Sequence, residues 1–372
     1  MKQHAVGLVL VLGFLTPVLT VAQAPGKKAP SATQAKFKAI WEPVNVKEDL
    51  ALVSVHFTSA DEGWLAGGAS SMSGGVILHT TDGGMTWETQ LGEPGSSDRG
   101  YDHLRFLDAR TGFAVQSTAS GDHRLLRTTD GKTWAPSGVV AQHRSDYRFV
   151  SPQVGFVSAA DDILRTSDGG KKWTSVYECR VKAEVQGLTR EIPCQVSALF
   201  FVDPNTGFGV TRDLGGGAGV AFVKTTDGGT KWSASVILPG ENGHEAGLHF
   251  VDPNNGLVRM QNGRIYRTSD AGQTWAETTG DIDGKPDFAF ADADVGWLAK
   301  YKTVLYTSDG GKKWLSREVS FPAMVEASSL PARDRGYVVG EHGMVYRYRI
   351  VPSDYTAKGM LPAAIIAAAS SK

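Results

Sequence analysis

Short runs of apolar residues recur along the chain and are separated by turns rich in Gly, Asp and Asn. Residues 199–202 (LFFV) end at the turn 203–207 (DPNTG), and residues 248–251 (LHFV) end at the turn 252–256 (DPNNG). Asp, Pro, Asn and Gly favour the backbone angles that tight turns need. The pattern predicts short antiparallel strands joined by tight turns, and therefore an all-β chain.

An eight-residue motif close to Thr-Thr-Asp-Gly-Gly-x-x-Trp, here called the box, follows six of these strands. Asp and Gly suit a turn because the carboxylate accepts backbone N–H groups and Gly adopts positive φ without a steric clash. The closing Trp is an apolar anchor worth about 2–3 kcal/mol when buried. Each copy predicts a hairpin corner with a structural Asp, namely Asp82, Asp130, Asp168, Asp227, Asp270 and Asp309, and the copy at Asp130 is one residue short.

The spacing of the Trp residues predicts the architecture. From Trp41 to Trp314 the chain covers 273 residues in six intervals, or about 45 residues each, a repeat length typical of propeller blades. A Gly followed by an aromatic or apolar residue precedes each of the six boxes. A seventh such pair, Gly336-Tyr337, is not followed by a box. We therefore predict a seven-bladed β-propeller with box hairpins, in which an N-terminal strand at 36–44 completes and closes the last blade.

The ends of the chain differ from the repeats. Lys2, an apolar run at 6–18 and small residues up to Ala22 predict a signal peptide over 1–22, with a retained N-terminal anchor as the alternative. A flexible leader over 23–34, a propeller over 35–350 and a tail over 351–372 follow. The signal peptide predicts an exported protein, periplasmic or secreted, or lumenal in a photosynthetic host, and we expect it to be a monomer. The apolar run at 361–369 is too short to span a membrane, so we expect no transmembrane span in the mature chain.

Composition and cysteine content limit the possible functions. With 372 residues, a net charge of −1 and 44 Gly, the chain is an ordinary turn-rich globular protein and not a nucleic-acid binder. Cys179 and Cys194 lie in the longest interval between boxes, which predicts a disulfide in an exported protein. The nine His are dispersed, so we expect no metal, and we expect no cofactor because the Gly-rich segment 215–219 lacks the setting of a phosphate loop.

Catalysis would require carboxylates that break the repeat. A glycosidase uses two carboxylates about 5–10 Å apart across a cleft. The candidates all lie in polar loops, where a solvated turn residue is the simpler interpretation: Asp161, Asp162, Glu241, Glu245, Asp281 and Asp283. We therefore expect no enzyme, and a secreted glycoside hydrolase, sialidase-like or xyloglucan hydrolase-like, is the alternative.

One column of polar residues stands immediately before the box. Its cationic members are Arg127, Arg165, Lys224, Arg267 and Arg347, and His79 and Tyr306 occupy the same position in two other repeats. On one face of the propeller these cations would bind acidic segments of a partner protein. Alternatively, each pairs within its own blade with a turn carboxylate such as Asp203 or Asp252, and is structural.

The box resembles the Asp-box, or bacterial neuraminidase repeat. Together with the Gly-aromatic pairs, over residues 52–350, it resembles the single-domain propellers of the photosystem II stability and assembly factor family. That resemblance implies a non-catalytic protein that holds a membrane-protein subunit on the lumenal or periplasmic side through an arginine-rich patch. Arg165–Gly170 (RTSDGG) is the nearest match, whereas Lys224, Tyr306, the short second box and the Cys insertion depart from the pattern.

Overall fold

The computed structural model describes residues 37–46, 49–68, 75–93, 99–118, 123–139, 146–243, 246–281, 288–300 and 303–355. The chain divides into two units, Lys38–Val351 and the two ends, Met1–Phe37 with Pro352–Lys372. The predicted signal peptide and leader, and the predicted tail beyond residue 355, lie outside the described residues. No helix within the described ranges is long and apolar enough to cross a membrane.

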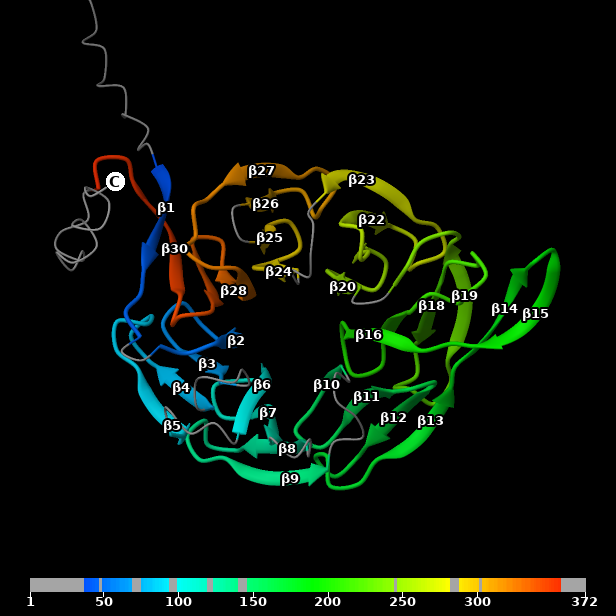
Figure 1. The fold of residues 1–372 in the computed structure, drawn as a ribbon, viewed down its shortest axis with the longest axis horizontal. Helices are drawn as coiled ribbons and strands as arrows, with labels where there is room; N and C mark the ends of the chain where they lie inside the picture. Colours follow the sequence, from blue (N-terminus) through cyan, green and yellow to red (C-terminus); the bar gives the residue numbers. More distant parts are fainter. Residues whose placement is uncertain are drawn as a thin grey trace, which may run out of the picture. The chain divides into compact units, whose positions relative to one another are not determined.

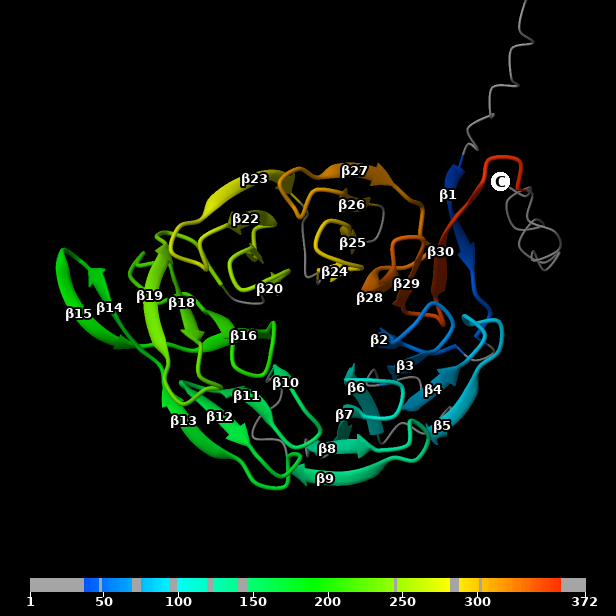
Figure 2. The ribbon, with the colours of Figure 1, turned by 180° about the vertical axis from the view of Figure 1, so that it is seen from behind.

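Seven four-stranded antiparallel blades and one separate hairpin make up the unit Lys38–Val351. The blades follow one another around a central axis, with the first strand of each blade innermost (Figure 1), and the view from behind shows the same circular order (Figure 2).

The strands of the first four blades have these bounds. Blade 1 is β2 (Leu52–Phe57), β3 (Gly63–Gly67), β4 (Val76–Thr80) and β5 (Glu88–Gly92). Blade 2 is β6 (Arg99–Phe106), β7 (Gly112–Thr118), β8 (His123–Thr128) and β9 (Ala135–Val139). Blade 3 is β10 (Tyr147–Phe149), β11 (Gly155–Ala159), β12 (Asp162–Thr166) and β13 (Thr174–Glu178). Blade 4 is β16 (Val196–Phe201), β17 (Gly207–Thr211), β18 (Val220–Thr225) and β19 (Ser233–Leu238).

The remaining blades complete the ring. Blade 5 is β20 (Gly247–Phe250), β21 (Gly256–Arg259), β22 (Arg264–Thr268) and β23 (Ala276–Asp281). Blade 6 is β24 (Ala289–Phe290), β25 (Gly296–Lys300), β26 (Thr303–Thr307) and β27 (Leu315–Glu318). Blade 7 is β28 (Val325–Ala332), β29 (Arg335–Gly340), β30 (Val345–Pro352) and β1 (Phe37–Pro43). The separate hairpin is β14 (Arg180–Val185) with β15 (Leu188–Pro193).

The N-terminal strand closes the ring as predicted. β1 is the outermost strand of blade 7, beside β30, so one blade combines both ends of the propeller sequence. Trp41 of β1 stacks on Trp297 of blade 6 at 5.1 Å between ring centroids and lies edge-on to Phe321 at 5.2 Å. Glu42 accepts hydrogen bonds from Arg347 at 3.2 Å and from Arg349 at 3.2 Å. The seven-bladed all-β prediction is confirmed.

Aromatic stacks join neighbouring blades. In six blades the innermost strand ends in a Phe, which we call the hub Phe. The hub Phe packs on the Gly that begins the next strand of its blade. A Cβ on Gly63 would overlap the ring of Phe57, and a Cβ on Gly112 would overlap the ring of Phe106. In blades 1 to 4 the residue after that Gly stacks on the hub Phe of the following blade, as Phe113 does on Phe149 at 3.5 Å. Tyr337 stacks on Phe57 at 3.5 Å and so joins blade 7 to blade 1. The Gly-aromatic pairs are therefore the contacts between blades.

In blades 1 to 6 a box forms the turn between the two outer strands. In the first box the Thr80 hydroxyl donates to Asp82 at 2.8 Å, and the Gly84 N–H donates to the Thr80 Oγ1 at 2.9 Å. The Thr86 N–H donates to the Asp82 carboxylate at 2.9 Å. The box Trp of each blade then stands edge-on to the hub Phe of its own blade, as Trp134 does to Phe106 at 5.8 Å and 90°.

Box carboxylates are held ionised by these donors. The pKa of each box Asp lies below its ordinary value. For Asp270 the hydroxyl and backbone N–H of Thr274, followed by the Thr268 hydroxyl, lower the pKa to about 2. The turns are therefore stabilised by ionised carboxylates.

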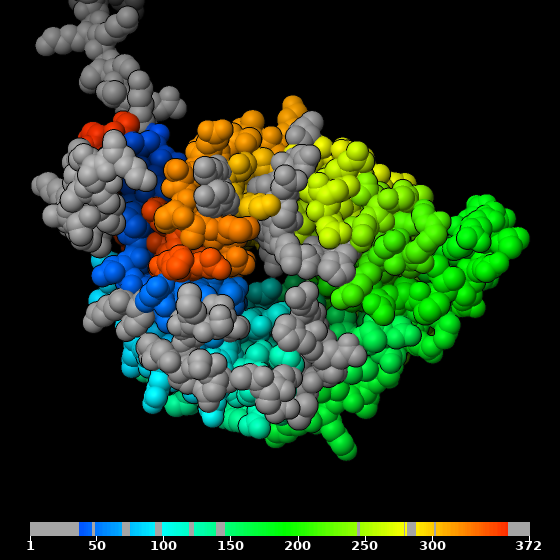
Figure 3. Space-filling view, in the orientation of Figure 1, coloured from blue at the N-terminus to red at the C-terminus, as the bar shows by residue number. Residues whose placement is uncertain are grey.

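A disulfide closes the base of the extra hairpin. Cys179 and Cys194 are bonded and buried, and their apolar neighbours include Phe156 and Val196. The hairpin β14–β15 projects from the rim beside β19 (Figures 1 and 3). Its turn has positive φ at Gln186 and Gly187. Val181 and Ala183 of β14 are buried, so one face of the hairpin is packed against the protein.

Replacing Trp41 should weaken ring closure. Trp41→Ala removes the stack on Trp297, and we expect a loss of about 3 kcal/mol in the free energy of unfolding, measured by urea denaturation. The exposed Leu315→Ala is the control and should change it by less than about 0.5 kcal/mol. Equal unfolding midpoints for the two variants would contradict closure by β1.

Opening the disulfide should destabilise the protein. A 15-residue separation predicts a contribution of about 3 kcal/mol from the restricted unfolded chain. Dithiothreitol should therefore lower the unfolding midpoint of the wild type and leave that of the double variant C179A/C194A unchanged. An equal response of both proteins to the reductant would contradict the assignment.

Acid should loosen the box turns. Because the folded pKa of Asp270 is lower than its unfolded value of about 3.9, its contribution is complete above pH 4 and is lost as pH falls toward 2. In thermal melts between pH 2 and pH 6, Asp270→Asn should show a smaller decrease in Tm on acidification than the wild type. Glu184→Gln, which changes an exposed carboxylate of β14, should keep the full decrease, and a wild-type slope in D270N would refute the effect.

Candidate functional site

A cavity of about 1130 Å³ lies along the central channel and is lined by the innermost strands. The residue just before the hub Phe of each blade, or before Leu330 in blade 7, lines this cavity. We call these residues the channel column: His56, Arg105, Arg148, Phe200, His249, Ala289 and Ser329. Successive residues of a strand point to opposite faces, so the hub residue packs between blades while its neighbour borders the channel.

Arg148 is held in place by the adjacent blade. Its Nε donates to the Leu199 carbonyl at 2.6 Å, and its Nη2 lies 3.1 Å from the Asp146 carboxylate. Asp146 also accepts the Leu199 N–H at 2.8 Å. Arg148 and Asp146 thus bind the carbonyl and the N–H of Leu199 on the inner edge of β16. Within the described ranges, Nη1 of Arg148 has no hydrogen-bond partner.

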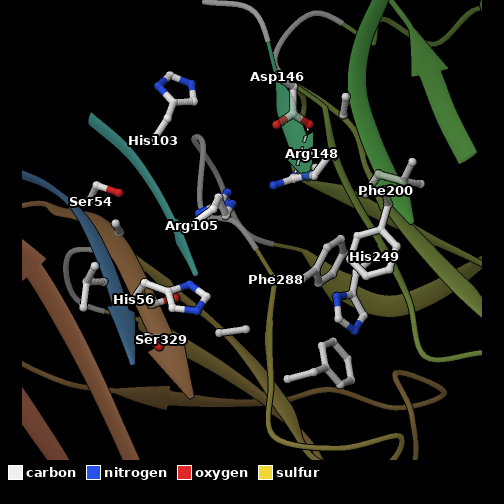
Figure 4. Close-up of a pocket in the computed structure, with 18 of the residues that line it drawn as sticks. Ser54, His56, His103, Arg105, Asp146, Arg148, Phe200, His249, Phe288 and Ser329 are labelled. Atoms are coloured by element: carbon white, nitrogen blue, oxygen red, sulfur yellow. Dashed lines mark ion pairs between the residues drawn. The ribbon is translucent and has the colours of Figure 1, made fainter. Parts of the chain in front are cut away.

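Arg105 follows an irregularity in β6. The register with β7 shifts between Asp102 and Arg105, and His103 there has a positive φ of 51°, which is uncommon for a residue other than Gly. His103 lies 2.9 Å from Asp102. Burial by itself would lower the pKa of His103, but its hydrogen bond and charge interaction with Asp102 raise it. The bulge therefore places a paired imidazole beside Arg105 (Figure 4).

The other two channel histidines stay neutral. Burial, followed by the charge of Arg105, lowers the pKa of His56 to about 3. Burial, followed by the charge of Arg148, lowers the pKa of His249 to about 3. Each arginine thus acts on one neutral imidazole, and the charges of the channel column are the two guanidinium groups.

Hydroxyl groups complete the wall. The Ser54 Oγ accepts the Leu104 N–H at 3.0 Å, and the Ser329 Oγ accepts the Phe57 N–H at 3.1 Å. Both bonds satisfy N–H groups on inner strand edges that have no further strand to pair with. At these two junctions a side chain of one blade thus holds the backbone of the next.

Two carboxylates near the channel arginines are already paired. Asp146 bonds Arg148 and Leu199, and Asp102 pairs with His103. A general acid must be held protonated and a nucleophile must face the substrate. Neither of these two carboxylates is placed in that way.

The carboxylates considered from sequence lie elsewhere. Asp162 accepts the Ser175 hydroxyl at 2.7 Å in the β11–β12 hairpin, next to Asp161. Glu241 accepts the Tyr266 hydroxyl at 2.7 Å and fastens a loop between blades 4 and 5. Asp281 ends β23, and Glu245 and Asp283 fall outside the described residues. Asp161, Asp162 and Glu241 do not line the channel cavity.

The predicted basic column lies between blades. Arg127, Arg165 and Lys224 are partly buried and lie over the rings of Phe113, Phe156 and Phe208, at 5.7, 6.0 and 5.8 Å. These rings belong to their cross-strand partners in the same blade. The column cations therefore cover the stacks that join the blades.

Two further members of this column reach the following blade. Arg267 donates to the Gly310 carbonyl at 3.4 Å, and Arg347 is buried and donates to the Gly83 carbonyl at 2.9 Å. Asp203 and Asp252, the turn carboxylates considered as partners of the column, accept N–H groups of their own turns, and the charge of Arg267 also helps to lower the pKa of Asp252. These contacts favour a structural role, and binding by the column stays a prediction.

The sequence did not single out Arg105 and Arg148. A signal was present, because each directly precedes the Phe that ends an innermost strand, as His56 and His249 do. The structure shows that the hub Phe packs on a Gly between blades, and therefore that the residue before it points to the channel. Within the described part of the chain, no group of three His, Cys, Asp or Glu side chains could hold a metal ion.

Comparison with known proteins identifies similar propellers. A family model described as photosynthesis system II assembly factor YCF48 matches residues 140–285. The photosystem II assembly protein Ycf48 of Thermosynechococcus vestitus is 22% identical over 325 residues, which cover 83% of this chain and 84% of that protein.

Solved structures show the same fold. YCF48 bound to D1 peptide is 20% identical with a TM-score of 0.57, over 83% of this chain and 96% of that one. YCF48 from Cyanidioschyzon merolae is 18% identical with a TM-score of 0.57, over 83% and 98%. The GH74 enzyme of Niastella koreensis is 14% identical with a TM-score of 0.56, over 82% and 53%. The chain is an Asp-box β-propeller that resembles the photosystem II assembly factors.

Proposed function

We propose that this chain is a non-catalytic, protein-binding propeller of the photosystem II assembly factor type. It acts outside the cytoplasm, as a monomer, and assembles or stabilises a membrane or exported protein. The similarity to Ycf48 over 83% of the chain supports this class. One similar structure holds a peptide of D1, which makes an extended protein segment the natural ligand to consider.

The observation that carries the proposal is the pair Arg105 and Arg148 in the channel wall. Guanidinium groups recognise carboxylates through paired N–H donors, and such charge-assisted bonds are about twice as strong as neutral ones. Arg148 is preorganised by Asp146 and Leu199. The channel therefore binds carboxylates of a partner segment that enters it.

A hydrolase remains the alternative because a GH74 enzyme shares the fold. However, the chain corresponds to only 53% of that enzyme, and Asp102 and Asp146 are both paired. The arrangement of the channel supports binding.

The test is the affinity of a fluorescently labelled acidic peptide, measured by anisotropy at low and high salt. The double variant R105Q/R148Q should bind it at least about tenfold more weakly, and salt should weaken wild-type binding by screening. A peptide with Asn and Gln in place of its acidic residues should not bind.

The matched control is a triple variant in the other arginine column, R127Q/R165Q/R267Q, which should keep its affinity. Loss of binding in this variant with normal binding in R105Q/R148Q would move the site to the face of the basic column. Turnover of chromogenic glycosides that a single carboxylate substitution abolishes would replace binding by hydrolysis.

A further inference from the structure

Aromatic side chains gather on the channel wall away from the arginines. Phe200 of β16, His249 of β20 and the pair Phe288 and Phe290 at β24 come from three successive blades. The His249 ring stacks on Phe290 at 4.4 Å and lies 4.8 Å from Phe200, and Phe288 lies 6.4 Å from His249. We call these four residues the aromatic wall.

The aromatic wall borders the cavity. All four rings line it, and each is only partly buried, unlike the fully buried Phe156 and Phe208 of the blade stacks. Figure 4 shows Phe200, His249 and Phe288 grouped apart from His56 and Ser329, with Arg105 and Arg148 between the two sides. His249 adds the face of its imidazole ring to this surface, through its stack on Phe290 and its contact with Phe200.

The blades thus divide the channel chemically. At the equivalent position of the channel column, blades 1 to 3 supply His56, Arg105 and Arg148, whereas blades 4 and 5 supply Phe200 and His249. A site with guanidinium groups beside aromatic rings is complementary to a ligand that carries an anion next to an apolar group. The cavity has a volume of about 1130 Å³, which is above the common range for small-molecule pockets. It is larger than the space needed to bind one side chain of a partner.

We propose that the channel binds an extended peptide segment in which a carboxylate lies next to a large aromatic or aliphatic side chain. The carboxylate contacts Arg105 and Arg148, and the apolar side chain packs on the aromatic wall. This inference rests on the proposed peptide-binding function and adds its specificity. Apolar burial against rigid rings gives affinity, while the paired arginines fix the direction in which the segment enters.

The experiment is a double-mutant cycle between protein and peptide. Two fluorescent peptides differ only at the residue after a central Asp, which is Phe in one and Gly in the other. The wild type should bind the Asp-Phe peptide about tenfold more tightly than the Asp-Gly peptide. Phe288→Ala should bring the two affinities to within about twofold of each other, because the ring that distinguishes the peptides is lost.

Two further variants separate the possible outcomes. R105Q/R148Q should weaken both peptides equally and keep the preference for Phe. Phe288→Leu, which retains apolar volume, should keep part of the preference and also serves if Phe288→Ala fails to fold in a thermal melt.

The outcomes distinguish this inference from the function on which it rests. Equal wild-type affinity for the two peptides, with loss in R105Q/R148Q, would overturn the apolar subsite and leave carboxylate binding intact. Absence of wild-type binding to either peptide would overturn both. A preference for Phe that persists unchanged in Phe288→Ala and Phe288→Leu would also overturn the assignment to the aromatic wall.

Discussion

The propeller depends on a single repeated contact, the hub Phe at the end of an innermost strand. In blades 1 to 5 its ring lies between an aromatic side chain of the preceding blade and the box Trp of its own blade, as Phe149 lies between Phe113 and Trp173. A Gly opposite the ring is required, because any Cβ there would overlap it. One contact therefore explains why Gly, aromatic and Trp residues recur at fixed spacing.

The same contact determines the position of the channel. Once the hub Phe is fixed between blades, strand alternation directs the preceding side chain to the central axis. The hub stacks form between the residue after each Gly and the hub Phe of the following blade, as Phe113 and Phe149 do, so the preceding residues can differ from blade to blade. His249 is an exception, because its ring stacks on the hub residue Phe290. They range from Arg148 to Phe200 and Ala289. The fold thus separates a uniform scaffold from a variable channel wall.

Two sets of arginines show how much side-chain direction matters. Arg127 and Arg267 stand on third strands and lie against rings or carbonyls between blades. Arg105 and Arg148 stand on first strands and border the cavity. All four carry the same charge, but only the second pair lines the cavity. The first set lies between blades, where Arg127 covers the Phe113 ring and Arg267 donates to the Gly310 carbonyl.

The sequence alone determined the number of blades, their order, the Asp-box hairpins and the strand that closes the ring, because each follows from local turn chemistry and a repeat length. It also indicated the pairing of Cys179 with Cys194. It could not identify the channel site, because Arg105, Arg148 and the aromatic wall come from five blades that are distant in sequence. Only the closed ring brings them to one axis, and only the strand register decides which side chains face that axis.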